Sequence, residues 1–484
     1  MDDRTAPSAQ SVAVNVSREL LDRTHSLAAS FLAGLAQRPV RGQAPLAELK
    51  ARLDVPLAEE PIEPLRVVEE LARSADPGLV ATAGPRYFGF VIGGSLPAAL
   101  AADWLTSAWD QNAGLYATSP AAAVVEDVAA GWLLDLLGLP KDASVGFVTG
   151  CQMANFSGLA SGRHAVLARV GFDVEEDGLA AAPAVNVVIG EEAHVTILAS
   201  LRLLGLGSRR VRRVQADEQG RMIPADLRRV LEGCQGPTIV CAQAGNVNTG
   251  AFDPLEEIAT ITRERGAWLH VDGAFGLWAG ASPRLRPLMR GAELADSWAT
   301  DAHKWLNVPY DCGIVIVRDA SVHTSAMKAR CGAAYLVLAQ GAERDPSDWA
   351  PEFSRRARGF TVYAALRSLG RSGVAEMIDR CCALARRMAE RLGAAPGVRI
   401  LNEVVLNQVL VRFEPRGDRD ADAFTRAVIA EVQRDGTCWL GGTRWRGHEA
   451  MRVSVSNWST TETDIDRAAD AILEAASRIE GAGP

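Results

Sequence analysis

The sequence predicts an α/β protein with a mostly parallel sheet and helices on both of its faces. Between residues 145 and 317, short apolar runs rich in β-branched residues alternate with longer segments of helical spacing. This alternation is typical of parallel sheets, whose strands are joined by helices. A proline-broken segment precedes it, and a shorter mixture of strands and helices follows it. We therefore predict a helical segment at 1–85, a large domain at 86–375 and a small α+β domain at 376–484.

Composition and charge exclude several classes of protein. The 484 residues are 48% hydrophobic, which suffices for a large core, and the net charge of -8 offers no positive surface for nucleic acid. No uncharged apolar run approaches the length of about 18 residues that suggests a membrane helix. The polar N-terminus has no signal-peptide pattern behind it. The eight cysteines are scattered, without CxxC pairs or zinc spacing, so we expect a cytoplasmic protein without a metal site.

The N-terminal region is predicted to be helical. After a disordered tail that ends near residue 14, apolar positions recur at helical spacing from Ser17 to Leu35. Prolines then break the chain into short helices that cannot form a core alone. We expect this segment to pack on another subunit or on the large domain. Further helices are expected from Pro97 to Ala108 and from Ser119 to about Leu137.

Strands and helices alternate in the central region. Because parallel sheets bind ligands at the carboxyl ends of their strands, residues that follow these strands are candidate site residues. They are Gly150, His194, Asn246, Asp272 and Lys304. The predicted strands are 145–148, 185–189, 238–242, 268–272 and 312–317, and the predicted helices are 154–170, 195–204, 224–231 and 254–265.

The pattern changes after the last central strand. It is irregular from about 320 to 350, which predicts a long loop of the kind that often forms a lid. Helices are predicted at 358–369 and 374–392. The small domain is predicted to contain strands at 409–413 and 451–456 and helices at 421–433 and 462–479.

Lys304 is the residue on which the functional hypothesis depends. It lies in the largely uncharged stretch 297–305, between His303 and Trp305, with predicted strands before and after it. Burial there would lower the pKa of the lysine and make its amine a nucleophile, and amine chemistry on a carbonyl means a Schiff base. Pyridoxal phosphate (PLP) is the commonest protein user of that chemistry. The alternative is a lysine at a helix end that pairs with Asp301.

A phosphate site would accompany such a lysine. The stretch 148–155 passes from a strand through Gly150 into a helix, whose first N–H groups and dipole favour an anion. The stretch matches neither the GxGxxG nor the GxxxxGKS/T pattern, which argues against a dinucleotide fold or an NTPase. A plain strand–helix turn is the alternative.

Two more residues have the chemistry that PLP requires. Asp272 ends an apolar strand, and a buried acid without a local partner calls for a cation such as a protonated ring nitrogen. The small Ala274 would let a ring lie close to this strand. His194, at a strand–helix junction, is a candidate to stack on the ring. The alternatives are a capping role for Asp272 and a partly exposed helix position for His194.

An aromatic stretch at 87–94 ends in two glycines and contains Tyr87, Phe88 and Phe90, and Trp109 follows the next predicted helix. Aromatic side chains beside glycine turns line ligand clefts, so we predict that these four residues form a wall of the substrate pocket. Packing in the core is the alternative. Such a wall would suit an aromatic or apolar substrate, whereas arginines would suit an acidic one, and the sequence does not decide between them.

Together these stretches resemble the group II PLP-dependent amino-acid decarboxylases, which include aromatic-L-amino-acid and glutamate decarboxylases. Two motifs carry most of the resemblance: His-Val-Asp-Gly-Ala at 270–274 and Asp-Ala-His-Lys at 301–304. The resemblance spans about residues 60–480, and it implies a fold-type I PLP enzyme with a seven-stranded type of sheet. It also implies an obligate homodimer in which the N-terminal segment clasps the partner. Supporting pieces are 119–120, 149–155, 193–194, 250–253 and 354–370.

The resemblance also implies a role for each candidate residue. Lys304 would form the Schiff base, Asp272 would hold the ring nitrogen, and His194 and Ala274 would lie on opposite faces of the ring. Tyr335 matches a loop tyrosine of the family that is proposed to protonate the substrate carbon, and an ordinary loop aromatic is the alternative. The remaining implied cofactor contacts are Gly150, Cys151, Gln152, Asn246, Asp301 and His303.

The chain departs from the family pattern in places. Cys151 and Gln152 replace the usual small or hydroxyl residues of the phosphate turn, and Asn246 stands where a threonine is often found. These departures put substrate specificity in more doubt than PLP binding. The segment 439–445 and Arg452 are further candidates to reach the pocket.

We therefore predict PLP-dependent decarboxylation of an L-amino acid to its amine through Lys304. Three other PLP reactions remain possible on the same scaffold: transamination, carbon–carbon cleavage and oxidative aldehyde synthesis. A catalytically silent binding protein that has kept the fold is an alternative from another class.

Overall fold

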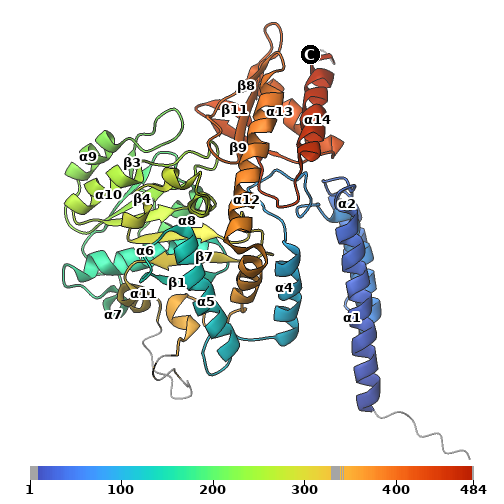
Figure 1. Cartoon of the computed structure of the whole chain (residues 1–484), viewed down its shortest axis with the longest axis horizontal. Helices are drawn as coiled ribbons and strands as arrows, with labels where there is room; N and C mark the ends of the chain where they lie inside the picture. Colours follow the sequence, from blue (N-terminus) through green and yellow to red (C-terminus); the bar gives the residue numbers. More distant parts are fainter. Residues whose placement is uncertain (1–8, 329–337, 339–340, 342, 482–484) are drawn as a thin grey trace, which may run out of the picture.

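Two β-sheets organise the chain. The computed structural model describes residues 9–328, 338, 341 and 343–481. A seven-stranded sheet lies at the centre of the molecule, and a four-stranded sheet lies near the C-terminus (Figure 1). The N-terminal helices lie beside these two sheets (Figure 1).

The central sheet has the strand order β1-β7-β6-β5-β4-β2-β3. Strands β2 to β6 are parallel, and β7 runs antiparallel between β1 and β6. The predicted α/β fold with a mostly parallel sheet is therefore confirmed. The strands are β1 (Ser144–Val148), β2 (Asn186–Gly190), β3 (Arg212–Val214), β4 (Thr238–Gln243), β5 (Trp268–Asp272), β6 (Ser297–Asp301) and β7 (Gly313–Val317).

Two strands of this sheet, β3 and β6, are missing from the sequence prediction. β6 is buried along its whole length although Ser297, Thr300 and Asp301 are polar. Hydrogen bonds satisfy its side chains; Trp268 Nε1, for example, donates to Ser297 Oγ at 2.9 Å. Apolar periodicity does not detect a buried strand of this composition. β3 is a short edge strand with two exposed arginines, a pattern that protects sheet edges.

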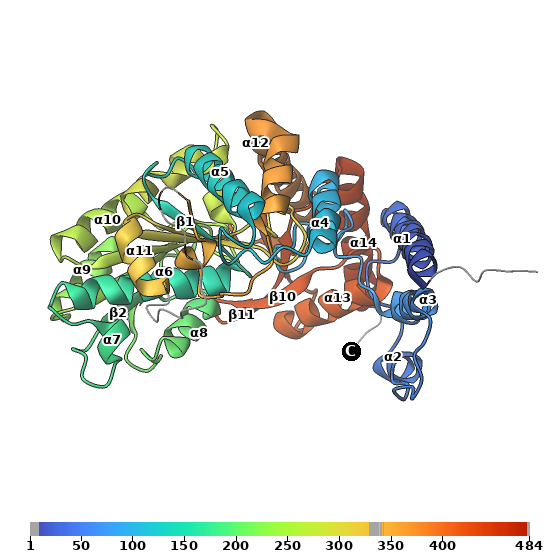
Figure 2. The ribbon, with the colours of Figure 1, turned by 90° about the horizontal axis from the view of Figure 1, so that it is seen from below.

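Helices cover both faces of the central sheet (Figure 2). α6 starts at Cys151, three residues before its predicted start, so the N-terminal end of the helix lies directly after Gly150. The helices on the α6 face are α6 (Cys151–Ala168), α8 (Val195–Leu203) and α11 (Ala320–Met327), with the short α7 (Val174–Asp177) beside α6. On the other face lie α5 (Pro120–Leu137), α9 (Pro224–Glu232) and α10 (Leu255–Glu264). Short 3-10 turns are η2 (Gly276–Ala281), η3 (Arg286–Met289) and η4 (Ala292–Leu294).

The N-terminal helices carry exposed apolar side chains. α1 begins at residue 9, so the prediction of a disordered tail is wrong for residues 9–14. Leu21, Leu46, Leu57 and Leu71 have exposed fractions of 68%, 70%, 97% and 59%. Nothing in the described part of the chain covers these side chains. The elements are α1 (Ala9–Gly34), α2 (Leu46–Leu53), α3 (Pro64–Ala75), η1 (Asp76–Gly78) and α4 (Pro97–Trp109).

The C-terminal region is built on α12 (Gly359–Gly393), which leads from the central sheet to the small sheet (Figure 1). Its backbone breaks at Gly370 (φ 61°, ψ 177°), so the two predicted helices are confirmed as its two arms. The small sheet has the order β10-β11-β9-β8. Its elements are β8 (Val398–Ile400), β9 (Gln408–Phe413), β10 (Gly441–Trp445), β11 (His448–Ser454), α13 (Ala421–Asp435) and α14 (Glu462–Gly481).

The segment predicted to be irregular from 320 to 350 begins with α11 and ends with η5 (Pro346–Trp349). The prediction is therefore wrong at both ends of the segment, where short helices form. The boundaries proposed at residues 85 and 375 stay predictions. In the residues that the structure describes, no helix has the length and apolar character that crossing a membrane requires.

Candidate active site

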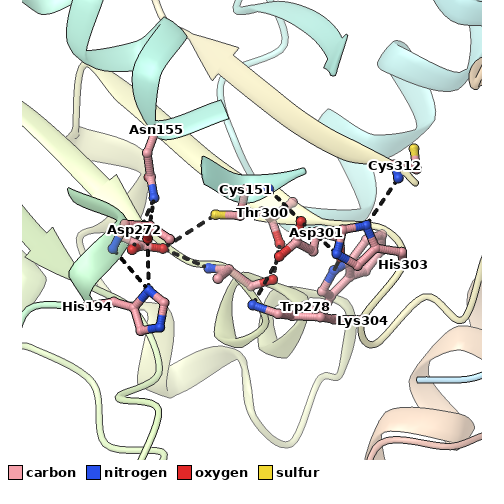
Figure 3. Close-up of polar contacts among 12 residues, drawn as sticks. Cys151, Asn155, His194, Asp272, Trp278, Thr300, Asp301, His303, Lys304 and Cys312 are labelled. Carbon is pink, nitrogen blue, oxygen red and sulfur yellow. Dashed lines mark hydrogen bonds and ion pairs between the residues drawn. The ribbon is translucent and has the colours of Figure 1, made fainter. Parts of the chain in front are cut away.

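Two buried carboxylates stand at the carboxyl ends of neighbouring strands. Asp272 ends β5 and Asp301 ends β6, and their exposed fractions are 4% and 2%. Cys151, the first residue of α6, touches both (Figure 3). Its backbone N–H donates to Asp301 Oδ1 at 2.5 Å, and its thiol Sγ lies 3.5 Å from Asp272 Oδ1. The helix start and the two strand ends therefore form one compact polar site.

Asp301 is paired with cationic or titratable groups of its own turn. Lys304 Nζ lies 3.0 Å from its Oδ2, and His303 Nε2 lies 3.3 Å from its Oδ1. The backbone N–H of Cys312 donates to His303 Nδ1 at 3.1 Å, which leaves the proton of a neutral imidazole on Nε2, facing Asp301. Tyr310 stacks on the His303 ring with 4.2 Å between centroids.

The pKa of Lys304 is raised above its ordinary value. Burial acts to lower it, as the sequence suggests, but the charge of Asp301, its hydrogen bond and the nearby Cys151 together outweigh burial. The prediction that the site lowers this pKa is therefore wrong for the arrangement seen here. The pairing with Asp301 is present, but Lys304 follows a strand and does not end a helix.

Asp272, by contrast, meets only neutral donors. Asn155 Nδ2 donates to its Oδ2 at 3.2 Å, and the backbone N–H of Ala274 donates to its Oδ1 at 3.1 Å. The third donor is the thiol of Cys151. Among the described residues, no lysine, arginine or histidine forms an ion pair with Asp272. A buried carboxylate with this set of partners fits a cation brought by a ligand, such as a protonated ring nitrogen.

His194 caps the start of α8 beside Asp272 (Figure 3). Its Nδ1 lies 2.8 Å from Thr196 Oγ1 and accepts from the backbone N–H of Thr196 at 3.4 Å. Burial lowers the pKa of His194, an effect that the charge of Asp272 partly offsets. The side chain is therefore a neutral, flat, half-buried ring at neutral pH, as stacking on a cofactor requires.

The predicted phosphate turn has the backbone that an anion site needs. Gly150 precedes α6, and a Cβ there would lie 3.2 Å from His303 Cε1. The side chain of Gln152 is exposed, and its backbone carbonyl oxygen accepts from Ser200 Oγ at 3.1 Å. Because the N–H of Cys151 donates to Asp301, the N–H groups that the helix start offers to an anion begin at Gln152.

Asn246 is almost fully buried, with an exposed fraction of 1%. Its Oδ1 accepts from the backbone N–H groups of Asn248 and Thr249 at 2.8 and 3.1 Å, and its Nδ2 donates to Gln243 Oε1 at 3.2 Å. The amide mainly shapes its own loop, which leaves one hydrogen of Nδ2 for a cofactor. Its predicted contact with the ring oxygen stays a prediction.

The predicted aromatic wall is divided in the folded chain. Tyr87 and Phe90 pack on Trp439 with centroid distances of 5.0 and 5.3 Å. Phe88 is buried in the core, with an exposed fraction of 1%. Trp109 is 48% exposed and packs edge-on against a ring of α12. Their role as substrate contacts stays a prediction.

The glycines that follow this aromatic stretch bring it to the lysine. A Cβ on Gly93 would lie 1.8 Å from the carbonyl oxygen of Lys304, so only glycine fits there. The stretch 87–94 is therefore held directly beside the candidate site. Tyr335 lies outside the described residues.

The sequence alone assigns no role to Asn155 or Arg452. Asn155 is the last residue of the stretch 149–155, but its contact with Asp272 depends on the packing of α6 against β5. Arg452, on β11, has one polar contact, to Asn248 Oδ1 at 3.5 Å, and no ion pair among the described residues. Burial lowers the pKa of Arg452, and its charge helps to lower the pKa of His194. Arg452 is thus an unneutralised cation near the site.

A cavity adjoins these groups on the side of β4 and α8. His194 and Asp272 are part of its wall, so it opens onto the candidate site. The other residues that line the cavity are Gly190, Glu192, Ala193, Ile197, Gly220, Cys241, Ala242, Gln243 and Asp253.

One of these residues, Asp253, is fully buried. Burial raises the pKa of Asp253 to about 6, although backbone N–H groups of Met222 and Gln243 donate to it. No group of three or more His, Cys, Asp or Glu side chains in the described ranges is arranged to hold a metal ion.

Comparison with known proteins identifies the family. The model of the pyridoxal-dependent decarboxylase conserved domain matches residues 46–414, so the chain belongs to this family. The cysteine sulfinic acid decarboxylase of Mus musculus is 30% identical over 443 residues, 87% of this chain and 87% of the relative. The aromatic-L-amino-acid decarboxylase of Bacillus atrophaeus is 26% identical over 427 residues, 86% of each chain. The crystal structure of mouse CSAD has a TM-score of 0.88 at 26% identity and covers 96% of this chain and 99% of that one.

The chain is accordingly a carboxy-lyase that uses PLP to decarboxylate an amino acid. The predicted family, fold type, cofactor and reaction class are confirmed. The residues present also fit the cofactor. They include a partly buried lysine, a carboxylate without a cation of its own, a flat neutral ring, and the N-terminal end of a long helix.

Proposed function

We propose that the enzyme decarboxylates an L-amino acid with an anionic side chain, and that Lys304 carries the cofactor. The observation that carries the substrate class is Arg452, a half-buried cation near His194 with no acidic partner in the described chain. An unneutralised cation of this kind favours an anionic ligand. Relatives with acidic substrates support the proposal, since the cysteine sulfinic acid decarboxylase matches at 30% identity and the aromatic-L-amino-acid decarboxylase at 26%.

Each site residue has a defined task in this proposal. Bound PLP supplies the electron sink for the bond that breaks as carbon dioxide leaves. Lys304 would hold the cofactor through Nζ, and Asp301 favours the ammonium form of the free lysine. Asp272 would hold the ring nitrogen through its carboxylate, and His194 would stack on the ring.

Two further groups would bind the ends of the ligands. The N–H groups of α6 that follow Cys151 would bind the cofactor phosphate. Arg452 would bind the anionic group of the substrate side chain. Tyr335 keeps its predicted task of protonating the substrate carbon.

The test is a panel of amino acids presented to the PLP-loaded enzyme. Aspartate, glutamate and cysteine sulfinate should yield carbon dioxide and their amines faster than tryptophan, tyrosine and phenylalanine. Arg452→Met should raise KM for the acidic substrates more than it lowers kcat, because it removes a binding charge. Aromatic amines as the only products would contradict the substrate class and leave the decarboxylase itself standing.

We further propose that the enzyme is a homodimer whose N-terminal helices clasp the partner. The exposed leucines of α1 to α3 support this, because monomers rarely leave so many large apolar side chains uncovered. Sedimentation should give twice the chain mass. The pair Leu21→Asp and Leu71→Asp should lower it to one chain, whereas Leu203→Asp, equally exposed on α8, should not. A fully active monomer in the unsubstituted protein would contradict the proposal.

The cytoplasmic location and the absence of nucleic-acid and membrane partners stay predictions from composition. Fractionation of the source cells and a nucleic-acid retention assay would test them directly.

A further inference from the structure

Five side chains form a continuous row of hydrogen bonds that ends at Asp272. Trp268, His270 and Asp272 alternate along β5, so they share the face of the sheet that α6 covers. Ser297 is the register partner of His270 on β6, and Asn155 comes from α6. All five are buried, with exposed fractions between 0% and 4%.

The row has four links, each within hydrogen-bonding distance. Trp268 Nε1 lies 2.9 Å from Ser297 Oγ, and Ser297 Oγ lies 2.8 Å from His270 Nδ1. His270 Nε2 lies 2.9 Å from Asn155 Oδ1, and Asn155 Nδ2 lies 3.2 Å from Asp272 Oδ2. The row thus joins the indole of a core tryptophan to the carboxylate of the active site.

Helix α6 is shaped to admit the two rings of this row. A Cβ on Gly158 would lie 2.8 Å from His270 Cε1, and a Cβ on Gly162 would lie 2.8 Å from Trp268 Cδ1. The two glycines are four residues apart and therefore on one face of the helix. Their lack of side chains lets both rings lie against the helix backbone.

The chemistry of the groups at the two ends decides which atom donates and which accepts in each hydrogen bond of the row. Asn155 Nδ2 faces two acceptors, Asp272 Oδ2 and Thr196 Oγ1 at 3.5 Å, so its Oδ1 faces His270. His270 must then carry its proton on Nε2, and its Nδ1 accepts from the hydroxyl of Ser297. An indole N–H can only donate, and Ser297 Oγ accepts from it. Every donor in this direction meets an acceptor.

The opposite direction would leave a proton without a partner. If His270 carried its proton on Nδ1, Ser297 Oγ would accept from both His270 and Trp268. Its own hydroxyl proton would then have no acceptor in the described part of the chain, at a side chain with an exposed fraction of 0%. A buried unsatisfied donor disfavours that state. Burial also lowers the pKa of His270 to about 4, which keeps its ring neutral.

We propose that Trp268, Ser297, His270 and Asn155 are positioning residues that act as a one-way hydrogen-bond relay and fix an N–H donor toward Asp272. The relay always directs the Nδ2–H of Asn155 at Asp272 Oδ2. Asp272 thereby receives a fixed neutral donor and forms no ion pair with a cation of the described chain. The inference rests on the proposed contact between Asp272 and the ring nitrogen of the cofactor.

The first test needs no cofactor. In protein with 15N-labelled histidine, the ring shifts of His270, assigned with His270→Gln, report which nitrogen carries the proton. The relay predicts the Nε2–H form in the unsubstituted protein. It predicts a shift toward the Nδ1–H form in Ser297→Ala, which removes the donor to Nδ1. The Nδ1–H form in the unsubstituted protein would overturn the relay, whatever the fate of the proposed function.

The second test reads the ring nitrogen of bound 15N-labelled PLP. It should be protonated in the unsubstituted enzyme and less so in Ser297→Ala. The dissociation constant of PLP should rise about three- to tenfold, as expected for one buried hydrogen bond. Asn155→Asp, which replaces the donor to Asp272 by a second carboxyl group, should have a larger effect.

Ser157→Ala is the matched control. Ser157 is a buried serine of α6, the helix that carries Asn155, and its hydroxyl donates to the backbone oxygen of Met153 at 2.9 Å. This variant should leave the nitrogen shift and the PLP affinity unchanged. A nitrogen that stays equally protonated in Ser297→Ala and Asn155→Asp would overturn the relay alone. An unprotonated nitrogen in the unsubstituted enzyme would overturn the proposed contact as well.

Discussion

Asp272 and Asp301 are both buried at the ends of adjacent strands, but their hydrogen-bond and ion-pair partners differ. Asp301 has a cation of its own chain, since Lys304 lies 3.0 Å away. Asp272 is surrounded by neutral donors, and the nearest three belong to Asn155, Cys151 and Ala274. One negative charge is therefore neutralised inside the protein, and the other remains for a ligand.

This difference matches the proposed roles of the two carboxylates. The ion pair with Asp301 raises the pKa of Lys304 and so favours its ammonium form. Asp272 has only neutral hydrogen-bond donors around it, so in the proposal it is the group that would hold a protonated ring nitrogen.

The largest effect is expected for Lys304→Ala. The chain has only four lysines, at 50, 141, 304 and 328, and the other three are exposed. The variant should produce no detectable amine and should lose the absorbance of covalently bound PLP. In the unsubstituted enzyme, borohydride reduction and peptide mapping should find the cofactor on Lys304. Label on Lys328, the control residue directly after α11, would contradict the assignment.

Asp272→Asn should lower kcat by about a hundred- to a thousandfold, the usual loss when one preorganised charge contact is removed. The reason is that a neutral amide cannot hold a protonated ring nitrogen as firmly as a carboxylate. Steady-state kinetics would measure the loss, and circular dichroism would verify folding. Activity within threefold of the unsubstituted enzyme would show that the charge of Asp272 is not used.

Asp301→Asn should change the pH dependence of PLP attachment. Asp301 raises the pKa of Lys304, so it keeps the amine protonated to a higher pH. Without that charge the pKa falls, the neutral amine is available at lower pH, and the midpoint of the attachment rate should move to lower pH. Stopped-flow absorbance between pH 6 and pH 10 would follow this change.

Asp311→Asn is the control for that experiment. Asp311 lies a few residues further along, where its Oδ1 pairs with Arg358 Nε at 2.9 Å. It is not among the main causes of the raised pKa of Lys304. Its replacement should leave the midpoint in place. A midpoint that moves to higher pH in Asp301→Asn would contradict the account of this ion pair.

The smallest effect is expected for Cys151→Ala. Its backbone N–H, which bonds Asp301, is kept, and only the weak thiol contact with Asp272 is lost. The loss in kcat/KM should be no more than about tenfold, the value of one modest hydrogen bond. Cys382→Ala, a buried thiol on α12, is the control. A loss as large as that of Asp272→Asn would mean that Cys151 does more than support the carboxylate.

The sequence allowed some of these elements to be predicted and concealed others. β5 was predicted with its true bounds because it is a short apolar run that ends in an acid. β6 was missed because its polar residues are buried through hydrogen bonds that only the neighbouring strand and helix reveal. Lys304 and Asp272 were found from their place at strand ends.

Charge partners could not be predicted in the same way. The raised pKa of Lys304 depends on the distance to Asp301, which the sequence spacing leaves open. Arg452 could be named as a candidate, but its lack of an acidic partner is a property of the fold. The direction of the hydrogen bonds at Asn155 likewise needs both neighbours in place.

A crystal structure of the PLP-loaded enzyme would test the central claim most directly. The account predicts that Lys304 Nζ is bonded to the cofactor and that a carboxylate oxygen of Asp272 lies about 3 Å from the ring nitrogen. It also predicts that Asn155 keeps its N–H toward Asp272. A ring nitrogen that faces Asp301, or a cofactor attached elsewhere, would contradict the account.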